Sequence, residues 1–256
     1  MYVIYQLEQT KGLSANLDVM QPPTDPHVPE TAFGKWFLRT ETWTVHVLER
    51  ALQDLERLMP AGQPRSFGVV ADVGCGFGRS LGKLNQRFAP QRLIGMDIDP
   101  EMLHESAKEV AALNIKAEFI CCSSSNIKLE DNSVDLLFCH QTFHHLIDQE
   151  RAIAEFYRVL KPGGVLLFAE STRRYIHSWV IRLLFRHPMD VQKTAPEYLA
   201  MVRAAGFSVP DSAVSYPFLW WSREDLGLME TALRIKPPAV REETLINLVA
   251  VKPVQL

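Results

Sequence analysis

The chain has 256 residues, 47% of them hydrophobic, and a formal net charge of -3. Its longest apolar stretch is too short and too charged to span a bilayer, and its slightly acidic balance gives no general attraction for nucleic acid. The N-terminus lacks the basic start and the apolar core of a signal peptide. We therefore expect a cytoplasmic globular protein with one sizeable core and no nucleic-acid partner.

The first part of the chain predicts an arm followed by a helix. Residues 1–33 are polar and contain four prolines, which favours an extended arm over a folded unit. Apolar residues then recur at helical spacing over residues 40–59, and a proline and a glycine follow. This helix can pack on a sheet or cap a ligand. We divide the chain into residues 1–60, an arm and cap helix, and residues 61–256, the main domain.

A cluster of glycines ends an apolar run at Val69–Ser80, VVADVGCGFGRS. The pattern predicts a buried strand, a tight turn and the start of a helix, which together form a cradle for a ligand. Glycines permit the backbone angles of such a turn and let a ligand approach the main chain. The residues expected to contact the ligand here are Asp72, Gly74, Cys75, Gly76 and Gly78.

The spacing of these glycines indicates which ligand the cradle holds. The dinucleotide fingerprint G-x-G-x-x-G needs a third glycine where this chain has Arg79, and no G-K-[ST] follows to make a phosphate-binding loop. The carboxylate of Asp72 would repel a pyrophosphate but suits a ligand that carries ammonium or sulfonium charge. The segment resembles motif I, D-x-G-x-G-x-G, of the class I S-adenosylmethionine (SAM) dependent methyltransferases. The resemblance implies SAM as cofactor; the alternative is an ordinary glycine-rich turn.

The next strand, within RLIGMDIDPEML, ends at Asp97. An acidic residue about 20 positions past the glycine loop, at the end of the following strand, is placed to bind both hydroxyls of a ribose. Ile98 and Met102 are candidates to flank an adenine ring. Asp99 is expected to cap the next helix, with Pro100 at its first position.

Further landmarks follow in the order that this family shows. A third strand, AEFICC, is followed by Ser123 and Ser124. In the family, an acidic residue that binds the adenine amino group often stands at this position, so the serines depart from the common pattern. The resemblance implies that a serine hydroxyl or the nearby backbone binds the adenine instead. The block DNSVDLLFCHQTFHHL resembles the fourth-strand motif, and the K-P-G-G turn at 161–164 resembles the next one. In the family the N-terminal segment often covers the cofactor. Aromatic residues that can supply that cover, or belong to the core, are Trp36, Phe37 and Trp43.

Three histidines are the candidate catalytic residues: His140, His144 and His145. Strand ends at this edge of a doubly wound sheet face the ligand crevice, so we expect these side chains near the reacting methyl group, with His140 also contacting the cofactor. An imidazole titrates near neutral pH and can take a proton from an acceptor, or it can be structural. On a continuous helix His140, His144 and Asp148 would share a face, but residues 141–146 are not expected to be helical and no fourth ligand is evident. We therefore predict no metal site.

The four cysteines show no C-x-x-C pair and lie in or next to expected strands. We predict buried, reduced thiols rather than a disulfide or a zinc site. They are Cys75, Cys121, Cys122 and Cys139.

The last third of the chain predicts the parts that set the substrate. Residues 173–187 read as one amphipathic helix, which either closes the active site as a lid or makes peripheral contact with a membrane. A capping box at Thr194 opens a helix that Gly206 closes, and strands are expected at 207–216 and 245–253. Between them a helix is expected from Ser222. Aromatic residues that can line a substrate pocket or cover the sheet edge are Tyr216, Phe218, Trp220 and Trp221.

These observations predict an α/β fold, a Rossmann-like sheet of seven mostly parallel strands with an antiparallel last strand, helices on both faces, and lid insertions near 172–195 and 216–240. The resemblance implies a methyltransferase that transfers a methyl group from SAM to a small, hydrophobic or aromatic acceptor. Two other functions stay open. The chain can be a binding or scaffold protein of the same fold without transfer activity, or an enzyme that uses SAM for other chemistry.

Overall fold

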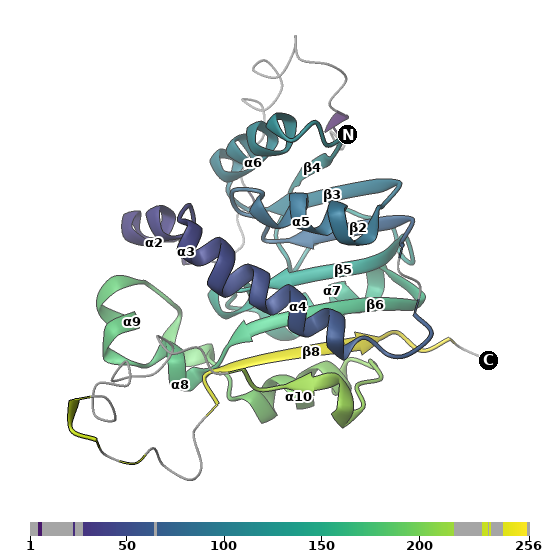
Figure 1. The fold of residues 1–256 in the computed structure, drawn as a ribbon. Coiled ribbons are helices and arrows are strands. Elements are labelled where there is room, and N and C mark those ends of the chain that lie inside the picture. The colour runs from purple at the N-terminus through teal and green to yellow at the C-terminus, as the bar shows by residue number, and fades with distance from the viewer. Residues whose placement is uncertain are drawn as a thin grey trace.

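A computed structural model describes residues 5–6, 23, 28–63, 66–217, 232–234, 236 and 243–254. Within them one sheet of eight strands runs through the molecule in the order β1-β4-β3-β2-β5-β6-β8-β7 (Figure 1). The strands are β1 (Tyr5–Gln6), β2 (Val69–Val73), β3 (Arg92–Asp97), β4 (Glu118–Cys121), β5 (Val134–His140), β6 (Leu160–Ser171), β7 (Val214–Ser215) and β8 (Leu245–Val251).

The direction of the strands confirms the predicted fold class. Strands β2 to β6 pair in parallel, whereas β8 runs antiparallel to both β6 and β7. The predicted strand at 207–216 is reduced to β7 and an isolated bridge between Ser208 and Val251. An additional edge strand comes from the N-terminal arm, because β1 pairs antiparallel with β4.

The order of the strands also locates a crevice. The chain builds β2, β3 and β4 outward in one direction and then returns to lay β5 against the other side of β2. Loops that follow β2 and β5 therefore leave the sheet in opposite directions. In open α/β sheets, ligands bind at the carboxyl ends of the strands beside such a switch point.

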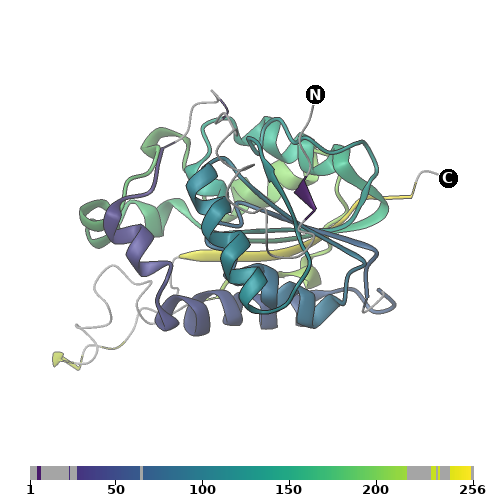
Figure 2. The ribbon, with the colours of Figure 1, turned by 90° about the horizontal axis from the view of Figure 1, so that it is seen from above.

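Helices cover both faces of the sheet (Figures 1 and 2). One apolar core lies beneath α4, α5 and α6, and a second lies beneath α7 and α10. The bounds are α4 (Glu49–Leu58), α5 (Arg79–Phe88), α6 (Pro100–Ala112), α7 (Gln149–Val159) and α10 (Ala195–Ala204).

The helix predicted over residues 40–59 forms with one irregularity. It consists of α3 (Glu41–Trp43), a π-helical turn η1 (Thr44–Leu48) and α4. The apolar stripe of α4, with Leu52 and Leu55 fully buried, packs in the same core as β6 and β8. Of the two predicted placements, packing on the sheet is therefore the observed one for α4.

The prediction of one helix over 173–187 is wrong. The segment divides into α8 (Arg173–Ile176) and α9 (Trp179–Leu184). Ser178 between them adopts an extended backbone, with φ -62° and ψ 147°, which interrupts the helical hydrogen bonding. The remaining short elements are α2 (Ala32–Phe37), η2 (Phe143–His145), η3 (Met189–Val191) and η4 (Asp211–Ala213).

Several local predictions are confirmed. Asp99 caps α6 by accepting from the N–H of Glu101 at 2.9 Å, and Thr194 with Glu197 forms the capping box of α10. All four cysteines are free thiols, and three are buried as predicted, whereas Cys121 is half-buried. The helix predicted from Ser222, with Phe218, Trp220 and Trp221, lies outside the described residues. No helix in the described part of the chain is long and apolar enough to cross a membrane.

Candidate functional site

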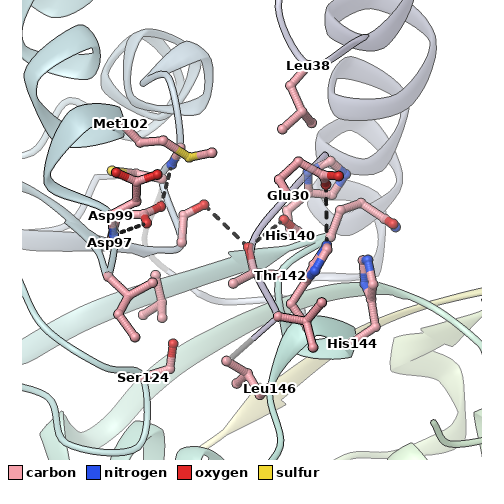
Figure 3. Close-up of a pocket in the computed structure, with 18 of the residues that line it drawn as sticks. Glu30, Leu38, Asp97, Asp99, Met102, Ser124, His140, Thr142, His144 and Leu146 are labelled. Carbon is pink, nitrogen blue, oxygen red and sulfur yellow. Dashed lines mark hydrogen bonds and ion pairs between the residues drawn. The ribbon is translucent and has the colours of Figure 1, made fainter. Parts of the chain in front are cut away.

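A pocket of about 230 Å³ opens at the carboxyl ends of β2, β3 and β5. Its walls come from the glycine cradle, the end of β3, the loop after β5, the N-terminal arm and the α8–α9 segment. Figure 3 shows Asp97, Asp99 and Met102 at one side of this space and Glu30 and His144 at the other, with Thr142 between them. The pocket therefore has a cradle end and a histidine end.

The cradle is shaped by three glycines with positive φ. A Cβ on Gly74 would lie 2.2 Å from the Thr142 methyl group, and one on Gly78 would lie 2.4 Å from the Ser106 hydroxyl, so both positions need glycine for packing. Gly76, with φ +53°, has no heavy atom within 4 Å of the corresponding position. Gly74 and Gly76 line the pocket, whereas Gly78 is not among the lining residues and supports the turn.

Two carboxyl groups face the cradle end. Asp97 accepts from the backbone N–H of Gly76 at 2.9 Å and from that of Asp99 at 3.0 Å. Asp72 is buried and accepts from the hydroxyl of Ser80. Burial raises the pKa of Asp72 to about 7, although the bond from Ser80 lowers it, and the nearby Asp97 raises it further. Burial likewise raises the pKa of Asp97.

Neither carboxyl group forms an ion pair with any residue that the structure describes. A buried acid without a cationic partner is costly to ionise. The cradle end therefore suits a ligand that brings hydrogen-bond donors and positive charge.

The other predicted cofactor contacts lie around the same end. Ile98, Met102, Ser123 and Ser124 all line the pocket. The Ser123 hydroxyl accepts from the N–H of Ser125 at 3.2 Å. Cys75 also lines the pocket, but its buried thiol lies 3.9 Å from the Ser106 hydroxyl. It is therefore the backbone of Cys75 that a ligand can reach.

His140 is placed as part of the pocket wall. Its ring stacks on Phe138 at 5.7 Å between centroids and packs against Trp43 at 5.5 Å. Burial, with a smaller contribution from His144, lowers the pKa of His140 to about 3. Its buried Nε2 has no hydrogen-bond partner in the described structure. A neutral imidazole in this setting is poorly suited to take a proton from a substrate.

His144 is held by a buried carboxylate. Its Nδ1 lies 2.7 Å from Oε2 of Glu170, at the end of β6. The other oxygen of Glu170 accepts from the backbone N–H groups of Thr142 and Phe143 at 2.8 and 2.7 Å. Because Nδ1 faces Glu170, the opposite ring nitrogen Nε2 points away from that carboxylate. The sequence did not single out Glu170 as a site residue, since it looks like the end of an apolar strand.

Four side chains gather at the histidine end of the pocket. The rings of His144, His145 and His187 lie 4.5 to 5.0 Å apart between centroids. Oε2 of Glu30 lies 3.6 Å from Nε2 of His145. Burial raises the pKa of Glu30 and lowers that of His187 to about 3. We call these four residues the histidine cluster.

The structure does not place His140, His144 and Asp148 on one helix face, which is the arrangement that the sequence analysis considered and did not predict. Asp148 caps α7 by accepting from the N–H of Arg151, and residues 143–145 form a single 3-10 turn rather than a long helix. His187 follows α9 and Glu30 belongs to the N-terminal arm. Because both are far from His144 in the sequence, no spacing of residues predicts that the three side chains lie together.

A family of sequences matches the core of this chain. Residues 71–168 match the model of a methyltransferase domain. The malonyl-[acyl-carrier protein] O-methyltransferase of Marinomonas sp. is 31% identical over 180 residues, which is 68% of this chain and 65% of that protein. This part of the chain belongs to the SAM-dependent methyltransferase family. The matched region of this methyltransferase-family chain includes the cradle, Asp97, His144 and His145.

Other relatives act on different substrates. The trans-aconitate 2-methyltransferase of Deinococcus radiodurans is 32% identical over 114 residues, 44% of this chain and 41% of that protein. The chain spans about 40% to 65% of the length of the curated relatives named here.

Solved structures share the fold at low identity. A methyltransferase solved with the Haloferax volcanii Trm112 activator has a TM-score of 0.61 at 20% identity, covering 86% of this chain and 93% of that one. The [4+2]-cyclase SpnF has a TM-score of 0.59 at 22% identity, with 81% of each chain covered. The fold of this family thus also carries a protein that is named for a cyclisation.

Proposed function

We propose that this chain binds SAM in the glycine cradle and transfers its methyl group to a small-molecule acceptor. The observation that carries the proposal is the pair of carboxyl groups at the cradle end, Asp97 bonded to the Gly76 backbone and Asp72 buried without a cation. SAM offers two ribose hydroxyls, a positively charged sulfonium and the ammonium group of its zwitterionic amino acid end. That pattern of donors and charge complements the two acids.

The residues for the rest of the cofactor follow from their places in the pocket. Asp97 would hold the ribose, and the backbone at Gly74–Gly76 with Asp72 would hold the charged end. Ile98 and Met102 would flank the adenine ring, and the hydroxyl or backbone of Ser123 and Ser124 would replace the acidic residue common in the family. The open space at Gly76 is where a side chain would obstruct this ligand.

When bound, SAM supplies an electrophilic methyl group on a sulfonium and leaves as S-adenosylhomocysteine. Displacement of this kind is accelerated chiefly by holding the acceptor in line and keeping water out. The histidine end lies across the pocket from Asp97, so we assign the acceptor to that end. An acceptor that must lose a proton can give it to His144 or His145. His140 instead shapes the wall.

The acceptor we propose is a molecule with an apolar body and one polar reacting atom. Apolar side chains from the arm, η1 and the α8–α9 segment line the space around the polar cluster. They include Phe37, Leu38, Val47, Ile176, Ile181 and Phe185. Burial of apolar surface against such walls favours a hydrophobic or aromatic acceptor. Of the predicted lid aromatics, Phe37 and Trp43 line the pocket, whereas Trp36 is exposed.

The α8–α9 segment supports both predicted roles at once. Ile176 and Ile181 are buried and line the pocket, as a lid requires. On α9, Trp179 and Leu183 are 62% and 75% exposed, one turn apart on the outer face, and Arg182 beside them is also exposed. An apolar pair flanked by basic side chains is typical of contact with an anionic lipid surface. We propose that the outer face of α9 touches a membrane from which an apolar acceptor arrives.

A second function remains because the fold is shared with a cyclase. An enzyme that holds SAM without breaking its bond to the methyl group would use the same cradle. A scaffold protein would bind SAM and turn over nothing. Methyl transfer, other SAM-dependent chemistry and a scaffold role therefore all predict SAM binding. Only the products of the reaction distinguish between them.

The test is incubation with methyl-labelled SAM and two matched panels of acceptors, one apolar with a single hydroxyl or amine and one polar. We expect S-adenosylhomocysteine and a methylated product from the apolar panel. Methylation of polar metabolites alone would overturn the apolar acceptor, and an acceptor converted without consumption of SAM would overturn methyl transfer.

A further inference from the structure

The histidine cluster has the composition of a metal site. His144, His145 and His187 each offer one ring nitrogen, and these three atoms lie within 4.8 Å of one another. The carboxylate of Glu30 lies 3.6 Å from Nε2 of His145. Imidazole nitrogens with a carboxylate form a ligand set for a divalent first-row transition ion, and for zinc in particular.

The buried glutamate behind His144 completes this pattern. Histidines that bind metals almost always donate their other ring N–H to a carboxylate or carbonyl, which fixes the tautomer and the ring orientation. Glu170 is fully buried, lies 2.7 Å from Nδ1 of His144 and is itself held by two backbone N–H groups. His144 is thus fixed with Nε2 available on the far side of its ring.

The other two ligands are brought in by contacts between the arm and α9. The hydroxyl of Thr31 donates to the carbonyl of Leu184 at 3.0 Å, and the rings of Phe33 and Phe37 pack edge-on against Phe185. These contacts place Glu30 and His187 on the same side of the pocket.

The side chain of Glu30 is held in place by its neighbours in the arm. Its Oε1 accepts from the N–H of Thr31 at 2.7 Å. A Cβ on Gly34 would lie 2.0 Å from the same oxygen, so the side chain of Glu30 occupies the space that this glycine leaves. The carboxylate is thereby directed at His145 and away from solvent, with 11% of its side chain exposed.

We propose that His144, His145 and His187 bind a zinc-like divalent ion at the histidine end of the pocket, with Glu30 as an exchangeable fourth ligand. Zinc bonds of about 2.0–2.1 Å in a tetrahedron place ligand atoms roughly 3.4 Å apart. The ring nitrogens, now within 4.8 Å of one another, would therefore close in by up to about 1.4 Å on binding, a movement within reach of side-chain rotations. The site is distinct from the cradle, which holds the cofactor through other residues.

The ion would select the acceptor. A metal-bound hydroxyl has a much lower pKa than a free one, so an acceptor that exchanges with Glu30 through an oxygen is held as the oxyanion. With the ion bound, His144 and His145 are its ligands, so the proton of the acceptor goes to solvent instead of to either ring. An oxygen lone pair then forms the new bond to the methyl carbon as the carbon–sulfur bond breaks. This part rests on the proposed function; the binding of the ion does not. The acceptor that such a site would select is an apolar molecule with a hydroxyl group that binds the ion.

The experiment is titration of the metal-free full-length protein with Co²⁺, followed by its visible absorption, and competition with Zn²⁺. The variants are His187→Ala, Glu170→Gln and, as matched control on the outer part of α6, His104→Ala. We expect one tight site in the wild type and in His104→Ala. Glu170→Gln should weaken binding about 10- to 100-fold, as loss of an orienting partner does, and His187→Ala should weaken it more.

SAM binding measured on the same samples separates this inference from the proposed function. His187→Ala and Glu170→Gln should retain SAM, because neither residue belongs to the cradle, and retention also shows that the variants are folded. No Co²⁺ absorption in the wild type, or equal binding by wild type and His187→Ala, would overturn the metal site. A site that binds Co²⁺ in a protein that does not bind SAM would leave the metal site standing and overturn the proposed function.

Discussion

The backbone N–H of Gly76 donates to Oδ2 of Asp97 at 2.9 Å, and this bond joins the glycine turn after β2 to the end of β3. The bond fixes the carboxylate of Asp97, which comes from the neighbouring strand, in the cradle without the help of a ligand. Oδ1 of the same residue accepts from the N–H of Asp99, so both oxygens are fixed by the backbone. A preformed site of this kind loses little entropy when it binds a ribose.

The first prediction concerns the space at Gly76. Gly76→Ala adds a Cβ where the chain leaves room and at positive φ, so we expect a loss of roughly 1–2 kcal/mol in stability and a large loss of SAM affinity. Gly62→Ala is the matched control, because Gly62 also has positive φ and an open Cβ position but lies outside the pocket. Isothermal titration with SAM checks this. Equal affinities in the two variants would contradict the placement of the ligand.

The second prediction is a pH dependence that originates at Asp72. Its folded-state pKa of about 7 lies above the ordinary value of 3.8, because the group is buried and lies near Asp97, although the hydrogen bond from Ser80 lowers it. Between these values the folded chain keeps a proton that the unfolded chain releases. The free energy of unfolding should therefore fall as pH rises from about 4 to about 7, by at most roughly 4 kcal/mol.

Denaturant unfolding across this pH range measures the effect. Asp72→Asn should reduce the slope to the part that other buried acids such as Asp97 and Glu30 contribute, because burial raises their pKa values as well. Saturating SAM should also reduce the slope, because positive charge on the ligand stabilises the carboxylate. The exposed substitution Asp211→Asn is the control and should keep the slope. A wild-type stability that rises over the interval, or an unchanged slope in Asp72→Asn, would show that Asp72 is not the group responsible.

A third prediction tests how the N-terminal part relates to the domain. We proposed a boundary near residue 60, yet Leu52 of α4 is fully buried in the core that includes β6 and β8. Leu52→Ala should cost about 2–5 kcal/mol of global stability. Val45→Ala, at a position 45% exposed in the preceding turn η1, should change the global stability by about 0.5 kcal/mol or less. If Leu52→Ala left global unfolding unchanged, α4 would be a detachable cap.

A fourth prediction separates the two faces of the α8–α9 segment. Ile181→Ala should raise KM for an apolar acceptor presented in solution, because Ile181 lines the pocket. Leu183→Ser should leave that KM unchanged and weaken cosedimentation with anionic phospholipid vesicles, because Leu183 faces outward. Equal vesicle binding by Leu183→Ser and wild type would exclude membrane contact through this face.

Signals that act over a few residues predicted their structures well. The glycine turn, the cap at Asp99, the capping box at Thr194 and the strand before Asp97 all depend on local backbone chemistry, which the sequence states directly. The parallel sheet followed from the same signals, because alternating strands and helices leave few topologies.

Features that depend on distant contacts were missed. Glu170 and His187 join His144 only because β6 lies beside β5 and the segment after α9 folds back over η2. Glu30 arrives from an arm whose composition predicted no site. The break at Ser178 was also missed, since the apolar spacing across it continues without change. The periodicity of apolar residues predicts which side chains share one face of a helix or strand. It does not predict which of these faces pack against each other.

The most direct test of SAM use at the cradle is thermal unfolding with SAM, S-adenosylhomocysteine or NAD, on the wild type, Asp97→Ala and the exposed control Asp211→Ala. At about 100 times its dissociation constant, a ligand that binds only the folded chain adds roughly 2.7 kcal/mol. We predict stabilisation by SAM and S-adenosylhomocysteine in the wild type and in Asp211→Ala, and its loss in Asp97→Ala. No shift with either ligand, or a shift with NAD alone, would contradict the assignment of the Gly74–Gly78 cradle to SAM.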